Sequence, residues 1–262
     1  MLARKRAEIG LGAQRRPRAE LERLTADRPL ARSLSEALRG RGVAVIAEVK
    51  RGSPSAGALD VGIDAPARAC LFEERGAAAV SVLTDAEFDG RLEDLEGIAA
   101  VVTVPVVRKD FLVDPWQVWE SRAAGADAAL VIVSALAPPE LDAMVAESAE
   151  AGLGLLVEIH DREEARPALD AGASVIGVNA RDLSSLAVDL EAALATVEWL
   201  RREAPGAVIV AESGIAGAEG VRRARDAGAD AVLVGEHLSR AADPGGALAR
   251  LVAAGREARG TS

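Results

Sequence analysis

The sequence repeats one short phrase four times, a Gly-Ala pair followed by a valine-rich run. The copies are RGAAAVSVLTD, AGADAALVIVS, AGASVIGVNARD and AGADAVLVGEH, and their glycines are Gly76, Gly125, Gly172 and Gly228. Each copy is typical of a glycine that ends a helix and is followed by a buried strand. One further helix–strand pair fits between successive copies, and the opening run VAVIAEVK adds one more strand. The pattern therefore predicts eight strands, each followed by a helix.

The predicted strands alternate strictly with amphipathic helices, which favours a parallel sheet covered by helices. Eight units between residues 43 and 257 indicate an α/β fold, a closed (β/α)₈ TIM barrel, with an open doubly wound sheet as the alternative. We expect a single domain over residues 1–262, in which a charged helical extension, residues 1–42, precedes the barrel and breaks at Pro17. The strands are predicted at residues 43–50, 78–84, 104–109, 127–133, 153–159, 174–179, 207–212 and 229–235.

Composition narrows the classes of partner. A net charge of −10 disfavours nucleic acid, because phosphate contacts need a basic surface. No apolar run reaches the ~20 residues that a membrane helix needs, so no membrane partner is expected. The single cysteine, Cys70, excludes an internal disulfide and makes a cytoplasmic location the default. His160 and His237 lack a third ligand at metal spacing, so we predict no metal.

Lysine is rare in this chain and its positions are informative. Only three of the 31 basic residues are lysines: Lys5, Lys50 and Lys109. Two of them, Lys50 and Lys109, stand at the ends of predicted strands. A lysine pKa can be shifted into a working range, whereas a guanidinium stays charged. These two lysines are therefore candidates for proton transfer.

Polar residues collect where the predicted strands end, while the strand beginnings are Gly, Ala, Val and Pro. In barrels of this kind the reacting groups lie at the carboxyl ends of the strands, so these residues are expected at one mouth. They include Glu48, Lys50, Lys109, Glu158, Asn179, Arg181, Glu212, Ser213, Gly214, Gly235 and Glu236.

Six segments resemble the indole-3-glycerol-phosphate synthase family of tryptophan biosynthesis. They are EVKRGSPSAG, PVVRKDFLVDPWQ, LVEIH, IGVNARDL, VAESGI and ADAVLVGE, and the resemblance covers residues 35 to 252. It implies a decarboxylating, dehydrating ring closure of 1-(2-carboxyphenylamino)-1-deoxyribulose 5-phosphate to indole-3-glycerol phosphate. It implies no cofactor, and a small anionic phosphosugar as substrate. Among proteins, other tryptophan-pathway enzymes are the candidate partners.

The resemblance also assigns the catalytic residues. Lys109 is similar to the family's general acid, and we expect a crowded cationic mouth to lower its pKa toward a working value. Glu158 matches the family's base or its electrostatic partner. Lys50, held by Glu48, matches the second lysine, which binds substrate anions or donates a proton in the dehydration. Asn179 and Glu212 match residues that hold the substrate hydroxyls and the lysines.

The binding residues follow from the same resemblance. Arg181, with backbone amides around Gly214 and Gly235, resembles a phosphate site beside Ser213 and Glu236. Ser53 and Ser55 are expected to face the carboxylate and ring end of the substrate, and the aromatic ring is expected between Pro54, Phe111 and Leu183. Two departures from the family are visible: only Phe88 stands where a pair of aromatic residues is usual, and Glu236 replaces a serine.

Other functions fit the sequence less well. The family of the isomerase that precedes this step, phosphoribosylanthranilate isomerase, is expected to have a Cys/Asp acid–base pair at strand ends. In this chain the single cysteine, Cys70, lies within a predicted helix. A non-catalytic paralogue is expected to have lost Lys109 or Glu158, and both are present. A paralogue that serves secondary metabolism uses the same reaction and stays open.

Overall fold

The computed structural model describes residues 2–40, 42–53, 57–58, 63–182 and 185–257, and in these residues eight parallel strands close into a barrel. Neighbours around the barrel follow chain order, and the last strand pairs with the first, with Ala44 beside Ala231. The prediction of a closed TIM barrel is therefore confirmed, and each strand lies within its predicted range. The strands are β1 (Ala44–Val49), β4 (Ala79–Leu83), β5 (Val106–Lys109), β6 (Ala128–Ile132), β7 (Gly154–Ile159), β8 (Val175–Asn179), β9 (Val208–Glu212) and β10 (Ala231–Val234).

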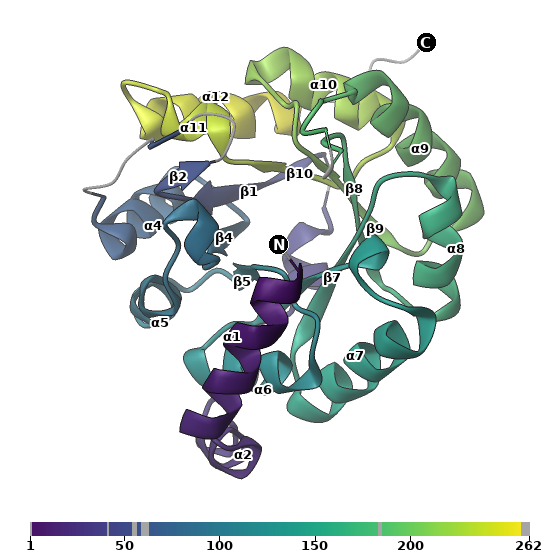
Figure 1. Cartoon of the computed structure of the whole chain (residues 1–262). Coiled ribbons are helices and arrows are strands. Elements are labelled where there is room, and N and C mark those ends of the chain that lie inside the picture. The colour runs from purple at the N-terminus through teal and green to yellow at the C-terminus, as the bar shows by residue number, and fades with distance from the viewer. Residues whose placement is uncertain (1, 41, 54–56, 59–62, 183–184, 258–262) are drawn as a thin grey trace.

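A ring of helices surrounds the barrel (Figure 1). The four glycines of the repeated phrase all have positive φ, between 80° and 100°, which lets the chain leave each helix and enter the next strand. Aspartates begin five of the ring helices by accepting hydrogen bonds from backbone amides one turn in. The ring helices are α4 (Ala65–Glu74), α5 (Leu92–Ala99), α6 (Pro115–Ala124), α7 (Pro138–Ala151), α8 (Arg162–Asp170), α9 (Leu190–Glu203), α10 (Gly217–Ala227) and α12 (Pro244–Arg256).

Several short elements decorate the strand ends. A two-stranded antiparallel ribbon, β2 (Gly52–Ser53) with β3 (Gly57–Ala58), follows β1 and is absent from the sequence prediction. The other short elements are η1 (Ala86–Phe88), η2 (Val133–Ala135) and α11 (Glu236–Ser239). None of the helices in the described residues has the length and apolar character of a membrane span.

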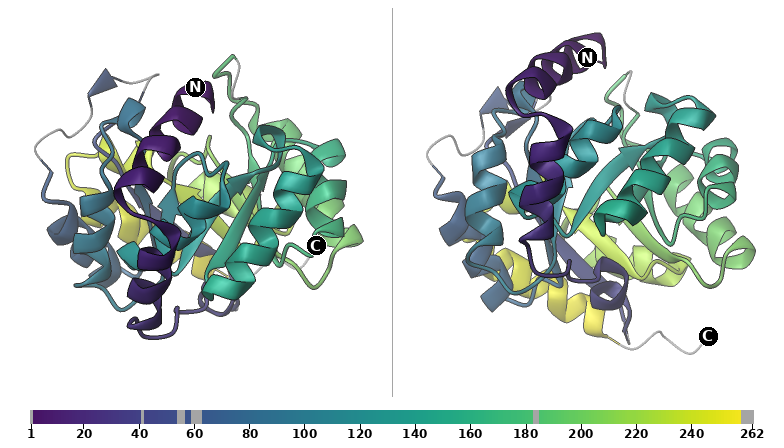
Figure 2. Two further views of the ribbon diagram at one scale, coloured as in Figure 1. Left: turned by 60° about the horizontal axis from the view of Figure 1, so that its bottom comes forward. Right: turned by 90° about the horizontal axis from the view of Figure 1, so that it is seen from below.

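Three helices precede the barrel, α1 (Leu2–Arg15), α2 (Arg18–Ala26) and α3 (Leu34–Leu38). The predicted break at Pro17 is confirmed, since Pro17 is the residue before α2 begins. Figure 2 shows α1 and α2 running down one side of the barrel. The apolar residues Leu34 and Leu38 of α3 then join the cluster that fills the barrel interior, so α3 covers the amino end of the sheet.

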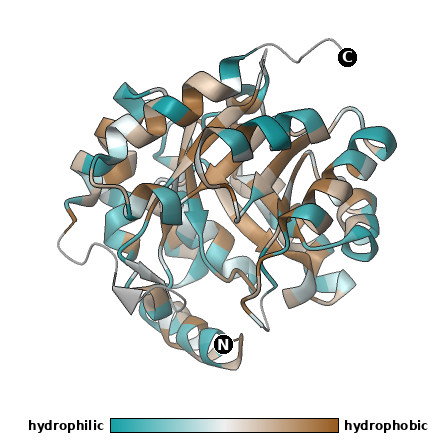
Figure 3. Cartoon of the chain, turned by 90° about the horizontal axis from the view of Figure 1, so that it is seen from above, coloured by the Kyte–Doolittle hydropathy of each residue, from teal (hydrophilic) through white to brown (hydrophobic). Residues whose placement is uncertain are grey.

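The barrel interior is filled with apolar side chains rather than open. Successive residues of a strand point to opposite faces, so every second residue of each strand faces the barrel axis. The inward residues form one packed cluster, whereas the outward residues pack against the helices in a second cluster. Figure 3 shows that hydrophobic residues prevail in the strands and that hydrophilic residues are frequent in the surrounding helices. The inner cluster includes Ile46, Val107, Leu156, Val210 and Leu233.

One buried carboxylate fastens the N-terminal helices to the amino end of the sheet. Asp127 precedes β6 and accepts 2.8 Å hydrogen bonds from the backbone amide and Nε of Arg32 and from the Val106 amide. Asp127 is buried, so these bonds form where water cannot replace them. The Asp127 carboxylate thus joins the segment after α2 to β5 and β6.

We expect Asp127→Ala to lower the free energy of unfolding by about 2 kcal/mol, because it leaves buried amide donors without an acceptor. Urea unfolding of the variant measures the loss. The matched control is Asp142→Ala, on an exposed position of α7, which should unfold like the wild type. Equal unfolding free energies for the two variants would contradict the role of Asp127.

Candidate active site

The inner face of the barrel becomes polar at the carboxyl ends of the strands. Glu48, Lys109, Glu158 and Glu212 each stand two residues after an inward apolar residue, and therefore point inward as the next layer. Asn179 holds the equivalent place after Gly177 on β8. All five side chains are largely buried. We call these five residues the mouth layer.

Lys109 lies among the carboxylates of the mouth layer. Its Nζ is 3.2 Å from Glu158 Oε2 and 3.7 Å from Glu212 Oε2. Burial by itself lowers the pKa of Lys109, but the carboxylates of Glu158, Glu212 and Glu48 outweigh it and hold the pKa above its ordinary value. The expectation of a lowered pKa is therefore wrong, because carboxylates rather than cations surround this ammonium in the free protein.

The two carboxyl groups beside Lys109 have opposite shifts. Burial raises the pKa of Glu158, but Lys109, the Asn179 side chain and His160 lower it below its ordinary value. Burial raises the pKa of Glu212 to about 8; Lys109 opposes this rise, and repulsion from Glu158 and Glu48 adds to it. At neutral pH Glu158 is a carboxylate and Glu212 is mostly protonated, which divides acid and base roles between them.

Two glycines make room for these carboxylates. A Cβ on Gly177 would overlap Glu212 Oε1, and a Cβ on Gly235 would overlap Glu48 Oε1. Gly235, expected as part of a phosphate site, is thus also required by the packing of Glu48. Gly177 was not singled out by the sequence analysis, although a glycine inside a strand signals a close approach of another group.

Lys50, the second lysine of the predicted site, forms an ion pair with a glutamate of β1. Lys50 Nζ lies 3.2 Å from Glu48 Oε1, and both side chains are shielded from solvent. This is the ion pair that the alternation of EVK along one strand indicates. The backbone of Ser53 lies in β2. Pro54, Ser55 and Leu183, three of the predicted binding residues, lie outside the described residues.

The predicted phosphate side lies around Arg181. The Arg181 amide donates to Asn179 Oδ1 at 3.0 Å, and its guanidinium lies 3.3 Å from Glu236 Oε2. Ser213 and Gly214 both have left-handed backbone, with φ of 62° and 69°. A non-glycine residue in this conformation costs about 1–2 kcal/mol, and such residues cluster at functional sites.

His160, which the sequence analysis considered only as a metal ligand, lies behind Glu158. Its Nδ1 is 3.0 Å from Glu164 Oε2, which also accepts from the His160 amide. Its Nε2 is directed toward Glu158 Oε1 at 3.8 Å. The hydrogen bond with Glu164 raises the pKa of His160, although burial opposes it, and Glu158 raises it further. Only the fold reveals this contact.

Two aromatic residues lie beside the mouth layer. Phe111 is buried in the inner apolar cluster, and Phe88 packs against the same cluster. Within the described part of the chain, no three His, Cys, Asp or Glu side chains are grouped so that they could hold a metal ion.

Comparisons with known proteins agree on one family. The family model described as "Indole-3-glycerol phosphate synthase" matches residues 1–251. The protein of that name from Streptomyces griseus is 48% identical over 93% of this chain and 91% of its own length. The one from Mycolicibacterium vanbaalenii is 50% identical over 84% of this chain and 80% of its own length.

Comparison of structures shows the fold alone. The 3-hexulose-6-phosphate synthase of Salmonella typhimurium aligns with a TM-score of 0.60 at 17% identity, over 81% of this chain and 98% of that chain.

The raised pKa of Glu212 predicts a pH-dependent stability. An unfolded chain has a glutamate pKa of about 4.3, so between about pH 4.3 and 8 the folded state keeps a proton that the unfolded state releases. Wild-type stability therefore falls as the pH rises through this window. Glu212→Gln cannot ionise, so its Tm relative to wild type should rise from pH 5 to pH 8.5, as measured by thermal unfolding.

The control for this prediction is Glu198→Gln, on an exposed position of α9, whose Tm should follow the wild type at each pH. A constant difference between Glu212→Gln and wild type across the window would show that Glu212 does not hold this proton.

Proposed function

The chain belongs to the indole-3-glycerol phosphate synthase family, and we propose that its mouth layer carries out the family's ring closure with Lys109 as the general acid. The reaction converts 1-(2-carboxyphenylamino)-1-deoxyribulose 5-phosphate to indole-3-glycerol phosphate, with loss of carbon dioxide and water. The observation that carries the assignment of roles is the buried ammonium of Lys109, held between Glu158 and Glu212.

The substrate has an anion at each end, and the mouth offers a cation for each. Arg181, beside the sharp turn at Ser213 and Gly214, is suited to the phosphate because a guanidinium donates two parallel hydrogen bonds to phosphate oxygens. Lys50, at the end of β1, is suited to the carboxylate of the aromatic ring. Phe111 lies in the apolar cluster at the mouth and contributes a surface for that ring.

Ring closure requires a proton at the C2′ carbonyl oxygen when the aromatic ring carbon attacks C2′. The raised pKa of Lys109 keeps its ammonium protonated at every working pH, so the acid is always loaded before the reaction. The alkoxide that develops on the oxygen is a strong base and accepts the proton from Lys109. The carboxylate then leaves the ring as carbon dioxide.

Dehydration follows, and it needs a base and an acid. Glu158 remains a carboxylate, because Lys109 and Asn179 lower its pKa, and it takes the role of base. Lys50 is the acid that we assign to the departing hydroxyl. Glu212, largely protonated at neutral pH, donates a hydrogen bond to a substrate hydroxyl and so completes the site. No electron acceptor is needed, since the losses are carbon dioxide and water.

The remaining assignments are also part of this proposal. We place the reaction in the cytoplasm, with other tryptophan-pathway enzymes as candidate partners, and we expect no cofactor. Phosphate binding by Arg181 requires its guanidinium to leave Glu236, which lies 3.3 Å away and also pairs with Arg240 at 3.1 Å. Glu236 therefore competes with the substrate for Arg181.

Lys109→Arg should fold normally and lose on the order of 10²-fold or more in kcat, because a guanidinium keeps the charge but does not give up its proton. Formation of the indole product in the presence of a metal chelator measures kcat. Lys50→Arg should also lower kcat, because Lys50 is the proposed acid of the dehydration. The control is Arg15→Lys, an exposed exchange at the end of α1, which should keep wild-type turnover. Near-normal turnover of a stable Lys109→Arg protein would remove the support for the general acid.

Arg181→Ala should raise KM by roughly 10-fold to 10²-fold with a smaller change in kcat, because one charge-assisted phosphate contact is lost. Steady-state kinetics with the same substrate measure both constants. Glu236→Gln should shift KM in the opposite direction, since it removes the competing carboxylate. An unchanged KM with a much lower kcat in Arg181→Ala would place Arg181 in the chemistry instead.

A further inference from the structure

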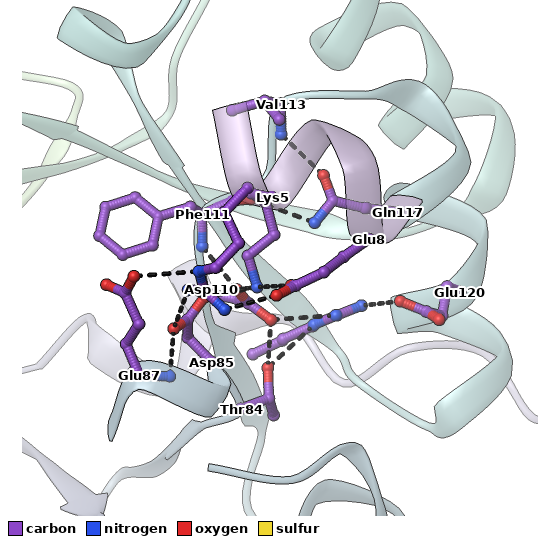
Figure 4. Close-up of polar contacts among 12 residues, drawn as sticks. Lys5, Glu8, Thr84, Asp85, Glu87, Asp110, Phe111, Val113, Gln117 and Glu120 are labelled. Carbon is purple, nitrogen blue, oxygen red and sulfur yellow. Dashed lines mark hydrogen bonds and ion pairs between the residues drawn. The ribbon is translucent and has the colours of Figure 1, made fainter. Parts of the chain in front are cut away.

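Lys5, the third lysine of the chain, also lies at the barrel mouth. It stands on α1 and is only 5% exposed. Its Nζ forms ion pairs with Asp85 and Asp110, the latter at 2.8 Å, and lies 3.3 Å from Glu8 (Figure 4). Burial lowers the pKa of Lys5, but Asp110 and Asp85 outweigh it and raise the pKa above its ordinary value. The ammonium therefore bridges two carboxylates from different strand ends.

Both carboxylates are buried and depend on this cation. Asp85 follows β4 and is fully buried, and Asp110 follows β5 and is 3% exposed. Asp110 also accepts hydrogen bonds from Thr84 at 2.7 Å and from Arg108 at 3.1 Å. Burial alone raises the pKa of Asp110, but Arg108 and Lys5 hold it far below its ordinary range. Without Lys5, the buried carboxylates of Asp85 and Asp110 would each lose an ion pair, which is costly for a buried charge.

The cluster of Lys5, Asp85 and Asp110 stabilises the end of β5, which carries Lys109. Arg108 and Lys109 are neighbours and point to opposite faces of β5, so Arg108 lies outside the barrel, where it binds Asp110, Glu120 and Ser121. Asp110 Oδ1 accepts the Phe111 amide at 2.8 Å. Gln117 holds the other side of the turn, through the Phe111 carbonyl at 3.1 Å and the Val113 amide at 2.8 Å.

α1 is fixed at both of its ends. Near its beginning, Arg4 joins Lys5 in binding Asp85 at 3.1 Å. After its end, the Arg16 carbonyl accepts from Trp116 Nε1 of α6 at 3.0 Å, and Gly12 lies against the Trp116 ring. Trp116, one of three tryptophans in the chain, therefore contributes a fluorescence signal that depends on the docking of α1.

We propose that Lys5 is a positioning residue for the ring closure. Its ammonium bridges Asp85 and Asp110 and so docks α1 at the edge of the mouth. The bridge also fixes the turn at residues 110–113, which places Phe111 beside Lys109. The inference rests on the proposed roles of Lys109 and Phe111. A cation is needed at this place because it lies between two buried carboxylates, and misplacement of reacting groups by about 1 Å costs on the order of 10²-fold in rate.

The test compares Lys5→Met with Arg15→Met, which removes the same charge from an exposed position at the other end of the same helix. We expect Lys5→Met to lower kcat by roughly 10-fold to 10²-fold while KM changes less than about 3-fold. Arg15→Met should keep wild-type kinetics. Lys5→Arg, which restores a cation between the carboxylates, should recover most of the lost kcat. Tryptophan fluorescence and Tm are recorded for every variant.

Wild-type kcat in Lys5→Met, with an active wild type, would overturn the inference and reduce Lys5 to a structural role. If Lys5→Met does not fold, Asp85→Asn replaces it, because it keeps the shape of the side chain and removes one of the two bridged charges. Its kcat should also fall, and an unchanged kcat would again overturn the inference. An inactive wild type would instead contradict the proposed function, so the two failures are distinguishable.

Discussion

The structure depends on a charge balance inside the end of a barrel from which water is largely excluded. Three carboxyl groups, Glu48, Glu158 and Glu212, share that space with the ammonium groups of Lys50 and Lys109. Charges in such a place must be paired or neutralised. The pKa of Glu212, raised to about 8, lets this group keep a proton near neutral pH, which removes one negative charge from the crowded space. Gly177 and Gly235 leave the space that the carboxyl groups of Glu212 and Glu48 occupy.

The sequence predicts the strands and the mouth layer well, for a physical reason. Strand alternation and the glycine-led repeat are local, and parallel strands place all carboxyl ends together. The pKa of Lys109 is raised by carboxylates from three other strands. The sequence analysis could not place these carboxylates around Lys109, and it therefore expected a lowered pKa. Lys5 and His160 were missed because their partners are set by helix docking and by Glu164 rather than by strand position.

The division of labour between lysine and arginine becomes clear from the fold. All three lysines lie at the mouth, and each lies beside buried carboxylates. Arginines serve where a planar fork reaches several acceptors, as Arg108 and Arg32 do at opposite ends of β5. The three lysines of the chain therefore mark positions where a single point charge lies beside buried carboxylates.

The docking of the N-terminal helices also orders events during synthesis of the chain. α1 and the segment after α2 are made before every residue that anchors them: Asp85, Asp110 and Asp127. The first strand likewise waits for the last, since β1 pairs with β10. α1 must therefore remain undocked at the ribosome until the segment up to Trp116 has been made, and the barrel cannot close until residue 234 is available. A helix made before the sheet thus reaches its place only after β4 and β5 have been made.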